Sequence, residues 1–305
     1  MILNKTVFDF TRPYIMGIIN VTPDSFSDGG VYNTPDSALK HIETLINQGA
    51  DIIDIGAESS RPGAESVSAE EEIKRLGPVL KKYSRYFSTP LSLDTYKAEV
   101  AEFGLSYGVD MINDISGLNA DESMPAIIKK YDVPVVLMHM SGTPKTMQKA
   151  PRYTDVVTEI KNKLQQSINI AQANNITQLI IDPGIGFGKT LQHNLTLINH
   201  LDEFQELGFP ILIGTSRKSM FAMIMDQNKP KSPSHQNPGV SETKITASGI
   251  QGTVSDSPCI PQRLGGTIAS VILSIQKGAN IVRVHDVGPV YEAVRFLQAV
   301  EGERV

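Results

Sequence analysis

The sequence contains a single cysteine, Cys259, in 305 residues. One cysteine leaves no partner for a disulfide within the chain, and chains without disulfides are typical of the reducing cytoplasm. The sequence also has no apolar run that approaches the roughly 20 residues that a membrane-spanning helix needs. Its first residues, Met1-Ile-Leu-Asn-Lys, lack the basic-then-apolar layout of a secretory signal peptide. We therefore predict a cytoplasmic protein with no membrane partner.

The chain also lacks an excess of positive charge. The 28 Lys and Arg residues are outnumbered by 33 Asp and Glu residues, giving a net charge of -5, which offers no support for binding to nucleic acid. The six histidines are scattered, and neither a His-x-x-x-His nor a Cys-x-x-Cys spacing occurs, which argues against a transition-metal centre. A Mg²⁺ ion that is bound by oxygen atoms and shared with phosphate groups remains open, and Asn20 offers one such oxygen.

What the chain does have is a repeated alternation of short apolar runs with helical patterns. Most runs are rich in Ile, Val and Leu without polar alternation, as in parallel strands that are covered on both faces. Eight such units in about 300 residues predict a (β/α)8 TIM barrel that forms one domain over residues 1–305. The alternative is an open doubly wound sheet, which usually has a Gly-rich turn after its first strand, where this chain has Asn20-Val-Thr-Pro-Asp24. The eight predicted strands cover residues 14–20, 50–57, 90–95, 111–115, 134–139, 179–183, 210–216 and 279–286.

Several local signals set the expected boundaries. Pro35 is suited to the first position of a helix, and Ser68-Ala-Glu-Glu71 is a candidate capping box. Glycines that precede four of the strands are expected to end helices in the left-handed conformation: Gly49, Gly108, Gly208 and Gly278. Residues 1–13 are expected to cap the floor of the barrel. Residues 226–263 are rich in Pro, Ser, Thr, Gly, Asn and Gln, which predicts a disordered insertion in the seventh crossover.

Polar side chains gather at the predicted ends of the strands, where barrels carry their active sites. Asp94, Asn113 and Asp182 offer carboxylate and amide groups that suit a flat heterocycle with paired N–H donors. A second group is rich in hydrogen-bond donors and suits a phosphorylated group: Asn20, Ser60, Arg61, Lys218, Arg283 and His285. Arg283 and His285 are two residues apart on one strand, so they point to the same face.

Several of these side chains also have a purely structural interpretation. Asp94-Thr95 and Thr215-Ser216 are each suited to capping the helix that follows. Asp114 and Asp286 are expected to order loops, and His139 to be a hydrogen-bonded wall residue rather than a ligand. Ser216 is not predicted to be a nucleophile, because Gly-Thr-Ser-Arg-Lys differs from the G-x-S-x-G elbow.

Seven motifs in order resemble those of the dihydropteroate synthase family over about residues 14–298, apart from the insertion. The motifs are Met16-Gly-Ile-Ile-Asn-Val-Thr-Pro-Asp-Ser-Phe-Ser-Asp28, Asp54-Ile-Gly-Ala-Glu-Ser-Ser-Arg-Pro-Gly63, Ser92-Leu-Asp-Thr95, Ile112-Asn-Asp-Ile-Ser-Gly117, Asp182-Pro-Gly-Ile-Gly-Phe-Gly188, Ser216-Arg-Lys-Ser219 and Val282-Arg-Val-His285.

The resemblance implies condensation of 6-hydroxymethyl-7,8-dihydropterin pyrophosphate with 4-aminobenzoate, giving 7,8-dihydropteroate and pyrophosphate. It implies pterin binding by Asp94, Asn113, Asp182, Lys218 and Arg283. It implies pyrophosphate binding by Asn20, Ser60, Arg61, Arg283 and His285, with Mg²⁺ as cofactor on Asn20. It implies an aminobenzoate pocket of Pro62, Phe187, Lys218 and Ser219. The expected catalytic residues are Asp94, Lys218, Arg283 and His285.

The resemblance further implies a homodimer and a target of sulfonamides. Two positions depart from the family pattern, because Ser60 stands where threonine is usual and Ala57 where a second glycine is common. Two other functions remain open on the sequence: a methyltetrahydrofolate-binding barrel and a non-catalytic barrel scaffold. The Ser-Arg-Pro-Gly and Ser-Arg-Lys-Ser elements argue against the first, and the intact set of ionisable residues argues against the second.

Overall fold

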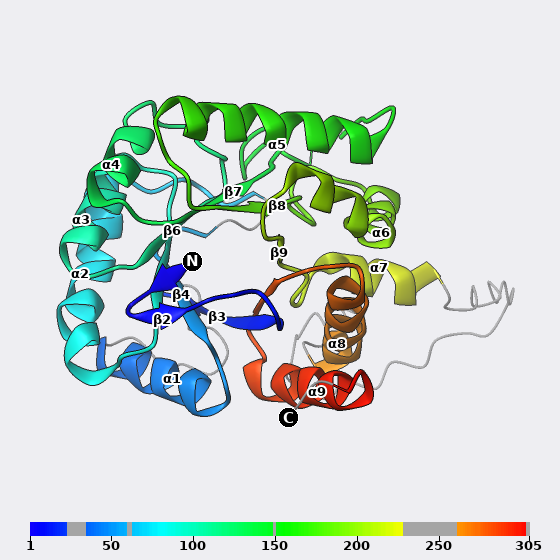
Figure 1. Ribbon diagram of the computed structural model, residues 1–305, viewed down its shortest axis with the longest axis horizontal. Helices are drawn as coiled ribbons and strands as arrows, with labels where there is room; N and C mark the ends of the chain where they lie inside the picture. Colours follow the sequence, from blue (N-terminus) through cyan, green and yellow to red (C-terminus); the bar gives the residue numbers. More distant parts are fainter. Residues whose placement is uncertain (23–34, 60–62, 149–150, 228–260, 303–305) are drawn as a thin grey trace, which may run out of the picture.

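A computed structural model describes residues 1–22, 35–59, 63–148, 151–227 and 261–302. The elements form a ring of helices around a cylinder of strands (Figure 1). The strands of the cylinder are β3 (Tyr14–Asn20), β4 (Ile52–Gly56), β5 (Leu91–Asp94), β6 (Met111–Asp114), β7 (Val135–Met138), β8 (Leu179–Asp182), β9 (Leu212–Ile213) and β10 (Ile281–Val284). The helices are α1 (Pro35–Asn47), α2 (Ala69–Tyr86), α3 (Ala98–Ser106), α4 (Met124–Tyr131), α5 (Val156–Ala173), α6 (Leu191–Asn199), the 3-10 helix η1 (Leu201–Leu207), α7 (Ser219–Gln227), α8 (Pro261–Gln276) and α9 (Val287–Val300).

All neighbouring strands of the cylinder are parallel. Within the described residues the order is β8-β7-β6-β5-β4-β3-β10-β9, so the first and last strands in sequence, β3 and β10, pair directly. The cylinder closes between β8 and β9 through a bridge between Ile181 and Ile211, where the Ile181 N–H donates to the Pro210 carbonyl at 2.9 Å. The predicted (β/α)8 barrel is therefore confirmed, and the open-sheet alternative is wrong.

The strands are shorter than the sequence predicted, most clearly for residues 210–216. Only Leu212–Ile213 form a strand there, because β9 has two register pairs with β10 and meets β8 at one bridge. The residues that follow, Gly214 to Ser216, leave the ladder and enter the loop at the barrel mouth.

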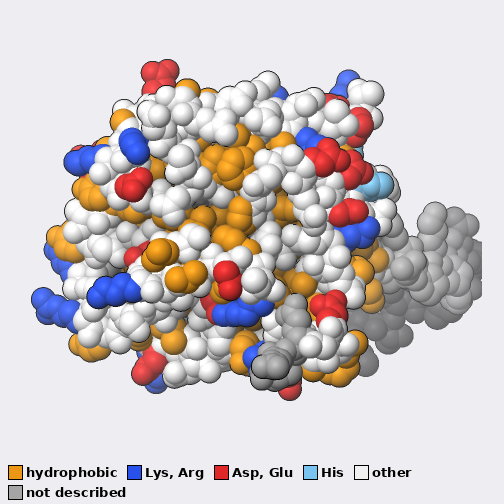
Figure 2. Space-filling view, in the orientation of Figure 1, with side chains coloured by type: hydrophobic (Ala, Val, Ile, Leu, Met, Phe, Trp, Pro, Cys, Tyr) orange, Lys and Arg blue, Asp and Glu red, His pale blue; other side chains and the backbone are white. Residues whose placement is uncertain are grey.

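Two hydrophobic layers hold the barrel together. Side chains that point outward from the strands pack under the helices, as Val282 and Val284 do, and both are fully buried. Side chains that point inward at the amino ends of the strands form a second cluster with Leu3 and Phe8. Leu3 belongs to the hairpin of β1 (Ile2–Leu3) and β2 (Thr6–Val7), which lies over the centre of the barrel (Figure 1). Hydrophobic side chains are concentrated near the centre of this same face, and most charged ones lie toward its rim (Figure 2).

The structure confirms most of the predicted helix boundaries. Helix α1 begins at Pro35, and the four pre-strand glycines all have a positive φ. Ser68 is the N-cap of α2 and accepts from the Glu71 N–H at 3.2 Å. The Glu71 carboxylate accepts from Arg75 at 2.8 Å instead, so the structure has the serine half of the predicted capping box.

The predicted insertion had boundaries that were too wide. Residues 226–227 belong to α7 and residues 261–263 to α8, because the helical pattern continues into both ends of the polar segment. The remainder of the insertion, residues 228–260, lies outside the described residues.

Candidate active site

The carboxyl ends of the strands bring the predicted polar residues to one end of the barrel. Asp94 is the last residue of β5, Asp182 is the last residue of β8, and Arg283 lies in β10. The register places Asp94 beside Asn113 on the neighbouring strand β6. Because parallel strands end at the same edge, residues nearly 200 positions apart in the chain contact one another here.

Arg283 is the centre of this cluster. Its Nε donates to Asp54 Oδ2 at 2.6 Å and its Nη2 to Asp94 Oδ2 at 2.6 Å. Asn113 Nδ2 donates to the same Asp54 oxygen at 3.2 Å. The Asp54 side chain is completely buried, and its second oxygen has no hydrogen-bond partner among the described residues. One guanidinium thus links two strands across the mouth, which fixes the positions of both carboxylates.

Burial controls the protonation of this cluster. It raises the pKa of Asp94 to about 7, against the opposing charge of Arg283. Burial also opposes the charge on Arg283, but Asp54 and Asp94 outweigh it and hold the Arg283 pKa above its usual value. Arg283 therefore stays charged and keeps its two donors directed at Asp54 and Asp94.

Asp54 was missed by the sequence analysis as a site residue. It was quoted only as part of a motif, although a carboxylate within the apolar run Ile52-Ile-Asp-Ile-Gly56 is a signal in itself. A buried charge of this kind needs a partner. The partner, Arg283, is 229 positions away, so the strand pattern alone did not identify it.

A second group of residues lies around the end of β8. Asp182 Oδ1 accepts from the Gly184 N–H at 2.7 Å, and burial raises the Asp182 pKa to about 6. Lys218 Nζ lies 4.0 Å from the centroid of the Phe187 ring, a cation–π contact. Burial lowers the pKa of Lys218 to about 8, and the nearby charge of Arg283 acts in the same direction. An aromatic face and an ammonium are thus held side by side next to a carboxylate.

Of the remaining predicted residues, the structure locates Asn20, Ser219 and His285. Asn20 ends β3 and is half-buried, and Ser219 is the first residue of α7. His285 follows β10, and its Nδ1 lies 3.0 Å from Ser216 Oγ. Three predicted residues lie outside the described part of the chain: Ser60, Arg61 and Pro62.

The structural interpretations of three residues are confirmed. Asp114 accepts from the N–H groups of Ser116 and Leu118 and so orders its loop. Asp286 forms an ion pair with Arg217 at 2.6 Å. His139 is buried and accepts from Lys189 Nζ at 3.0 Å, as expected for a wall residue.

Comparison with known proteins decides the family. The family model described as "Pterin binding enzyme" matches residues 16–285. The chain belongs to the pterin-binding enzyme family. It is 43% identical over 279 residues to the dihydropteroate synthase of Clostridium beijerinckii, with 90% of each chain covered.

Solved structures of pterin-binding enzymes agree. The chain superimposes on the Yersinia pestis dihydropteroate synthase in a sulfonamide complex with a TM-score of 0.85, 38% identity and 99% of both chains covered. It superimposes on the Xanthomonas albilineans dihydropteroate synthase in complex with 7,8-dihydropteroate with a TM-score of 0.78 and 36% identity, covering 97% of this chain and 96% of that one.

A Mg²⁺ ion at the mouth of this pterin-binding enzyme would take most of its ligands from bound phosphate groups and water. The described residues contain no group of three or more His, Cys, Asp or Glu side chains that would hold a metal ion. The half-buried amide of Asn20 offers one hard oxygen ligand at the mouth. Mg²⁺ commonly takes one or two protein ligands and completes its shell with phosphate oxygens and water.

No helix in the searched part of the chain has the length and apolar character needed to span a membrane.

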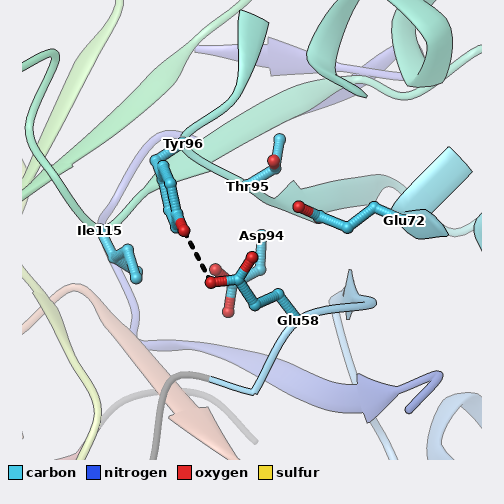
Figure 3. Close-up of a pocket in the computed structure, with 6 residues that line it drawn as sticks. All are labelled: Glu58, Glu72, Asp94, Thr95, Tyr96 and Ile115. Carbon is cyan, nitrogen blue, oxygen red and sulfur yellow. Dashed lines mark hydrogen bonds between the residues drawn. The ribbon is translucent and has the colours of Figure 1, made fainter. Parts of the chain in front are cut away.

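A network beside the mouth holds Glu58, and Figure 3 shows one part of it, the hydrogen bond from Tyr96. Lys97 bonds to both Glu58 and Glu72. Glu58 also accepts from the Tyr96 hydroxyl at 2.6 Å and from the Val67 N–H at 3.3 Å. A cavity of about 10 Å³, roughly the space of one water molecule, is lined by Glu58, Glu72, Asp94, Thr95, Tyr96 and Ile115 (Figure 3). Lys97 and Glu72 were not predicted from the sequence, where the only local signal is that Glu72 lies on the buried stripe of α2.

The pKa of Asp182 predicts opposite effects of pH on pterin affinity and on stability. Pterin affinity should rise as the pH increases through about 6, because the ionised carboxylate is the better acceptor. The raised pKa contributes stability that is complete below the ordinary value of 3.8 and is lost as the pH rises through about 6. Titration calorimetry with a pterin and urea denaturation between pH 4 and 8 measure both trends.

The Asp182→Asn variant provides the control for this prediction. Its pterin affinity should be lower and should lack the rise near pH 6 that belongs to this group. An unchanged rise in the variant would assign it to another residue.

Proposed function

We propose that this pterin-binding enzyme is a dihydropteroate synthase, which condenses 6-hydroxymethyl-7,8-dihydropterin pyrophosphate with 4-aminobenzoate to give 7,8-dihydropteroate and pyrophosphate. The observation that carries the proposal is the arrangement at the mouth, where buried acceptors lie beside the Lys218–Phe187 pair. Relatives and solved structures of that activity match nearly the whole chain at about 40% identity, and the product of the proposed reaction is the ligand of one of them.

The pterin is held by the acceptor cluster. The carboxylates of Asp94 and Asp182 accept from the polar edge of the ring, the Asn113 amide can accept and donate, and the Arg283 guanidinium covers one ring face. Lys218 lies at the side of the ring nearest Phe187. The bond between the pterin methylene carbon and the pyrophosphate oxygen breaks first, and the ring stabilises the resulting cation by resonance. Carboxylates in the buried cluster favour this developing positive charge.

Pyrophosphate departs toward the donor-rich side of the mouth. Asn20, Ser60, Arg61, Arg283 and His285 hold it, and the Ser216 hydroxyl orients the His285 ring. Mg²⁺, held by Asn20 and the phosphate oxygens, would supply neutralising charge for the leaving group. These donors stabilise the negative charge that develops as the bond breaks.

The arylamine occupies the second pocket. Pro62, Phe187, Lys218 and Ser219 form this pocket, with the aromatic ring of the substrate against Phe187 and its carboxylate toward Lys218 and Ser219. The neutral amine attacks the methylene carbon, and the new C–N bond forms before the nitrogen loses its proton to water. An arylamine is uncharged at pH 7, so the attack itself requires no general base.

A pyrophosphate-release assay tests the proposal. The expected result is Mg²⁺-dependent release that requires both the pterin pyrophosphate and 4-aminobenzoate, with formation of 7,8-dihydropteroate in equal amount. Release with the pterin substrate alone would indicate hydrolysis rather than condensation. Binding of a methylated folate without any release would support the methyltetrahydrofolate-binding alternative, and no turnover in a folded protein would support a scaffold.

Three further properties belong to the same proposal. Sulfonamides should inhibit in competition with 4-aminobenzoate, because they resemble it in shape and charge. The protein should form a homodimer in a reducing cytoplasm. Exposed hydrophobic side chains on adjacent helices support an interface there: Met223 of α7, Leu273 of α8 and Phe296 of α9. Light scattering in solution, with the mass of two chains as the expected value, measures the oligomeric state.

A further inference from the structure

A buried lysine that has no role so far lies directly behind the active site. Lys189 is 3% exposed, and its Nζ lies 2.8 Å from the Gly184 carbonyl, 2.9 Å from the Phe187 carbonyl and 3.0 Å from His139 Nδ1. All three partners are uncharged. An ammonium has three N–H donors, and the His139 carbonyl at 3.4 Å adds a fourth, longer contact with an uncharged acceptor. Burial lowers the pKa of Lys189 to about 7, against the opposing charge of Asp182. A buried ammonium without a directly bonded counter-ion is costly, so its retention calls for specific contacts.

These contacts organise the loop between β8 and α6. Lys189 ends the segment and reaches back to the carbonyls of Gly184 and Phe187 within it, while the Phe187 N–H donates to the Gly184 carbonyl at 3.1 Å. Gly184 has a φ of 69°, and a Cβ at this position would lie 2.0 Å from the His139 carbonyl oxygen. The loop is therefore pressed against the barrel wall with the lysine as its internal support.

Two residues of the proposed site depend on this loop, one just before it and one near its end. Asp182 precedes it and accepts from the Gly184 N–H at 2.7 Å. Phe187 lies near its end and places its ring 4.0 Å from Lys218 Nζ. Since Lys189 bonds to the carbonyl of Phe187 itself, the position of that ring depends on the lysine more directly than the position of the Asp182 carboxylate does.

The charge of Lys189 also reaches Asp182. Three cations face this carboxylate and lower its pKa against the effect of burial: Lys218, Lys189 and Arg283. Burial lowers the pKa of His139 to about 3, and the Lys189 charge adds to this effect. His139 is thus neutral, and its Nδ1 is free to accept from the ammonium.

We propose that Lys189 is a positioning residue for the arylamine pocket, which supports Phe187 from behind and sets the affinity for the second substrate. It does not touch either substrate. This inference rests on the proposed synthase function, because the second substrate is the arylamine of that reaction. The effect is expected to be larger for the arylamine than for the pterin, since Lys189 bonds to the carbonyl of Phe187 itself, whereas the pterin acceptors Asp94 and Asn113 lie on β5 and β6.

The test compares Lys189→Met with the wild type and with the matched surface variant Lys40→Met. In Lys189→Met the KM for 4-aminobenzoate should rise about tenfold or more, because displacement of a positioning group by an ångström is enough for such losses. The KM for the pterin pyrophosphate at pH 8 should stay within about twofold of the wild type. Equal increases in both KM values, or no increase in either, would overturn the proposal.

A pH profile and hydrogen exchange separate positioning from a general loss of stability. Removing a cation near Asp182 should move the rise of pterin affinity to higher pH, whereas a purely structural role would leave it in place. Amide exchange in residues 183–190 should become faster in Lys189→Met, and unchanged exchange would also overturn the proposal. Exchange does not depend on turnover, so an inactive wild type would contradict the synthase function and leave this measurement valid.

A second variant keeps the test informative if Lys189→Met does not fold. Lys189→Gln retains N–H donors for the loop carbonyls but loses the charge. It should shift the pH profile as Lys189→Met is expected to do, with a smaller increase in the KM for 4-aminobenzoate. If neither variant moves the pH profile or raises the KM for 4-aminobenzoate, Lys189 has no role beyond filling space.

Discussion

Replacement of Arg283 by methionine is expected to lower kcat/KM by about 10²–10³-fold, the loss that usually follows removal of one preorganised donor. Arg283 is proposed to cover the pterin ring and to hold the leaving group. Its removal also leaves Asp54 and Asp94 close together without the cation that joins them. One of the two carboxylates should then take up a proton, so the pterin loses an acceptor as well. Steady-state assays of pyrophosphate release measure the loss.

The control must separate catalysis from folding, because Asp54 is completely buried. Breaking a buried pair by removing one partner commonly costs about 3–5 kcal/mol of stability. The double variant Arg283→Met with Asp54→Asn removes one of the stranded charges and should recover part of that stability without recovering activity. Arg283→Lys keeps the charge but not the two-armed geometry, and should be intermediate. Near-normal turnover in a folded Arg283→Met variant would remove Arg283 from the mechanism.

Replacement of Lys97 by methionine is expected to lower the free energy of unfolding by about 3–5 kcal/mol. Lys97 is the cation between Glu58 and Glu72, whose side chains are 9% and 1% exposed. Burial already raises the pKa of Glu72, against the effect of Lys97. Without the lysine both carboxylates face each other in a site that excludes most water. Urea denaturation at pH 7 measures the change.

Two comparisons identify the cause of that loss. Lys97→Met combined with Glu72→Gln should recover much of the stability, since one buried charge is gone. Lys130→Met removes an ion pair whose side chains are 59% and 44% exposed, and should cost less than about 1 kcal/mol. The deficit of Lys97→Met should also shrink as the pH is lowered from 7, because burial raises the pKa of Glu72 and its protonation relieves the repulsion. A deficit that does not change with pH would point to lost packing.

The elements that local patterns govern were predicted well. Pro35 began its helix, the glycines before four strands adopted positive φ, and the apolar runs formed parallel strands, because each depends on backbone conformation or burial within a few residues. The ends of the strands were predicted poorly. The two-residue strand β9 shows the reason, since its length depends on how far its neighbours remain in register.

The sequence by itself determined which residues could take part in the chemistry. The order of the motifs indicated a barrel with a pterin site, and the alternation of apolar runs placed Asp94, Asn113, Asp182 and Arg283 at one end of it. These inferences succeed because strand ends in a parallel barrel share an edge, so position along a strand is enough to group them.

Only the tertiary structure decided which of those side chains are paired. It joined Arg283 to Asp54 and Asp94, placed Lys97 between Glu58 and Glu72, and turned Lys189 back into its own loop. Such pairings depend on ångström distances between segments that are far apart in the chain, and on burial that makes a partner for each charge necessary. Local patterns in the sequence indicate burial but do not encode these distances.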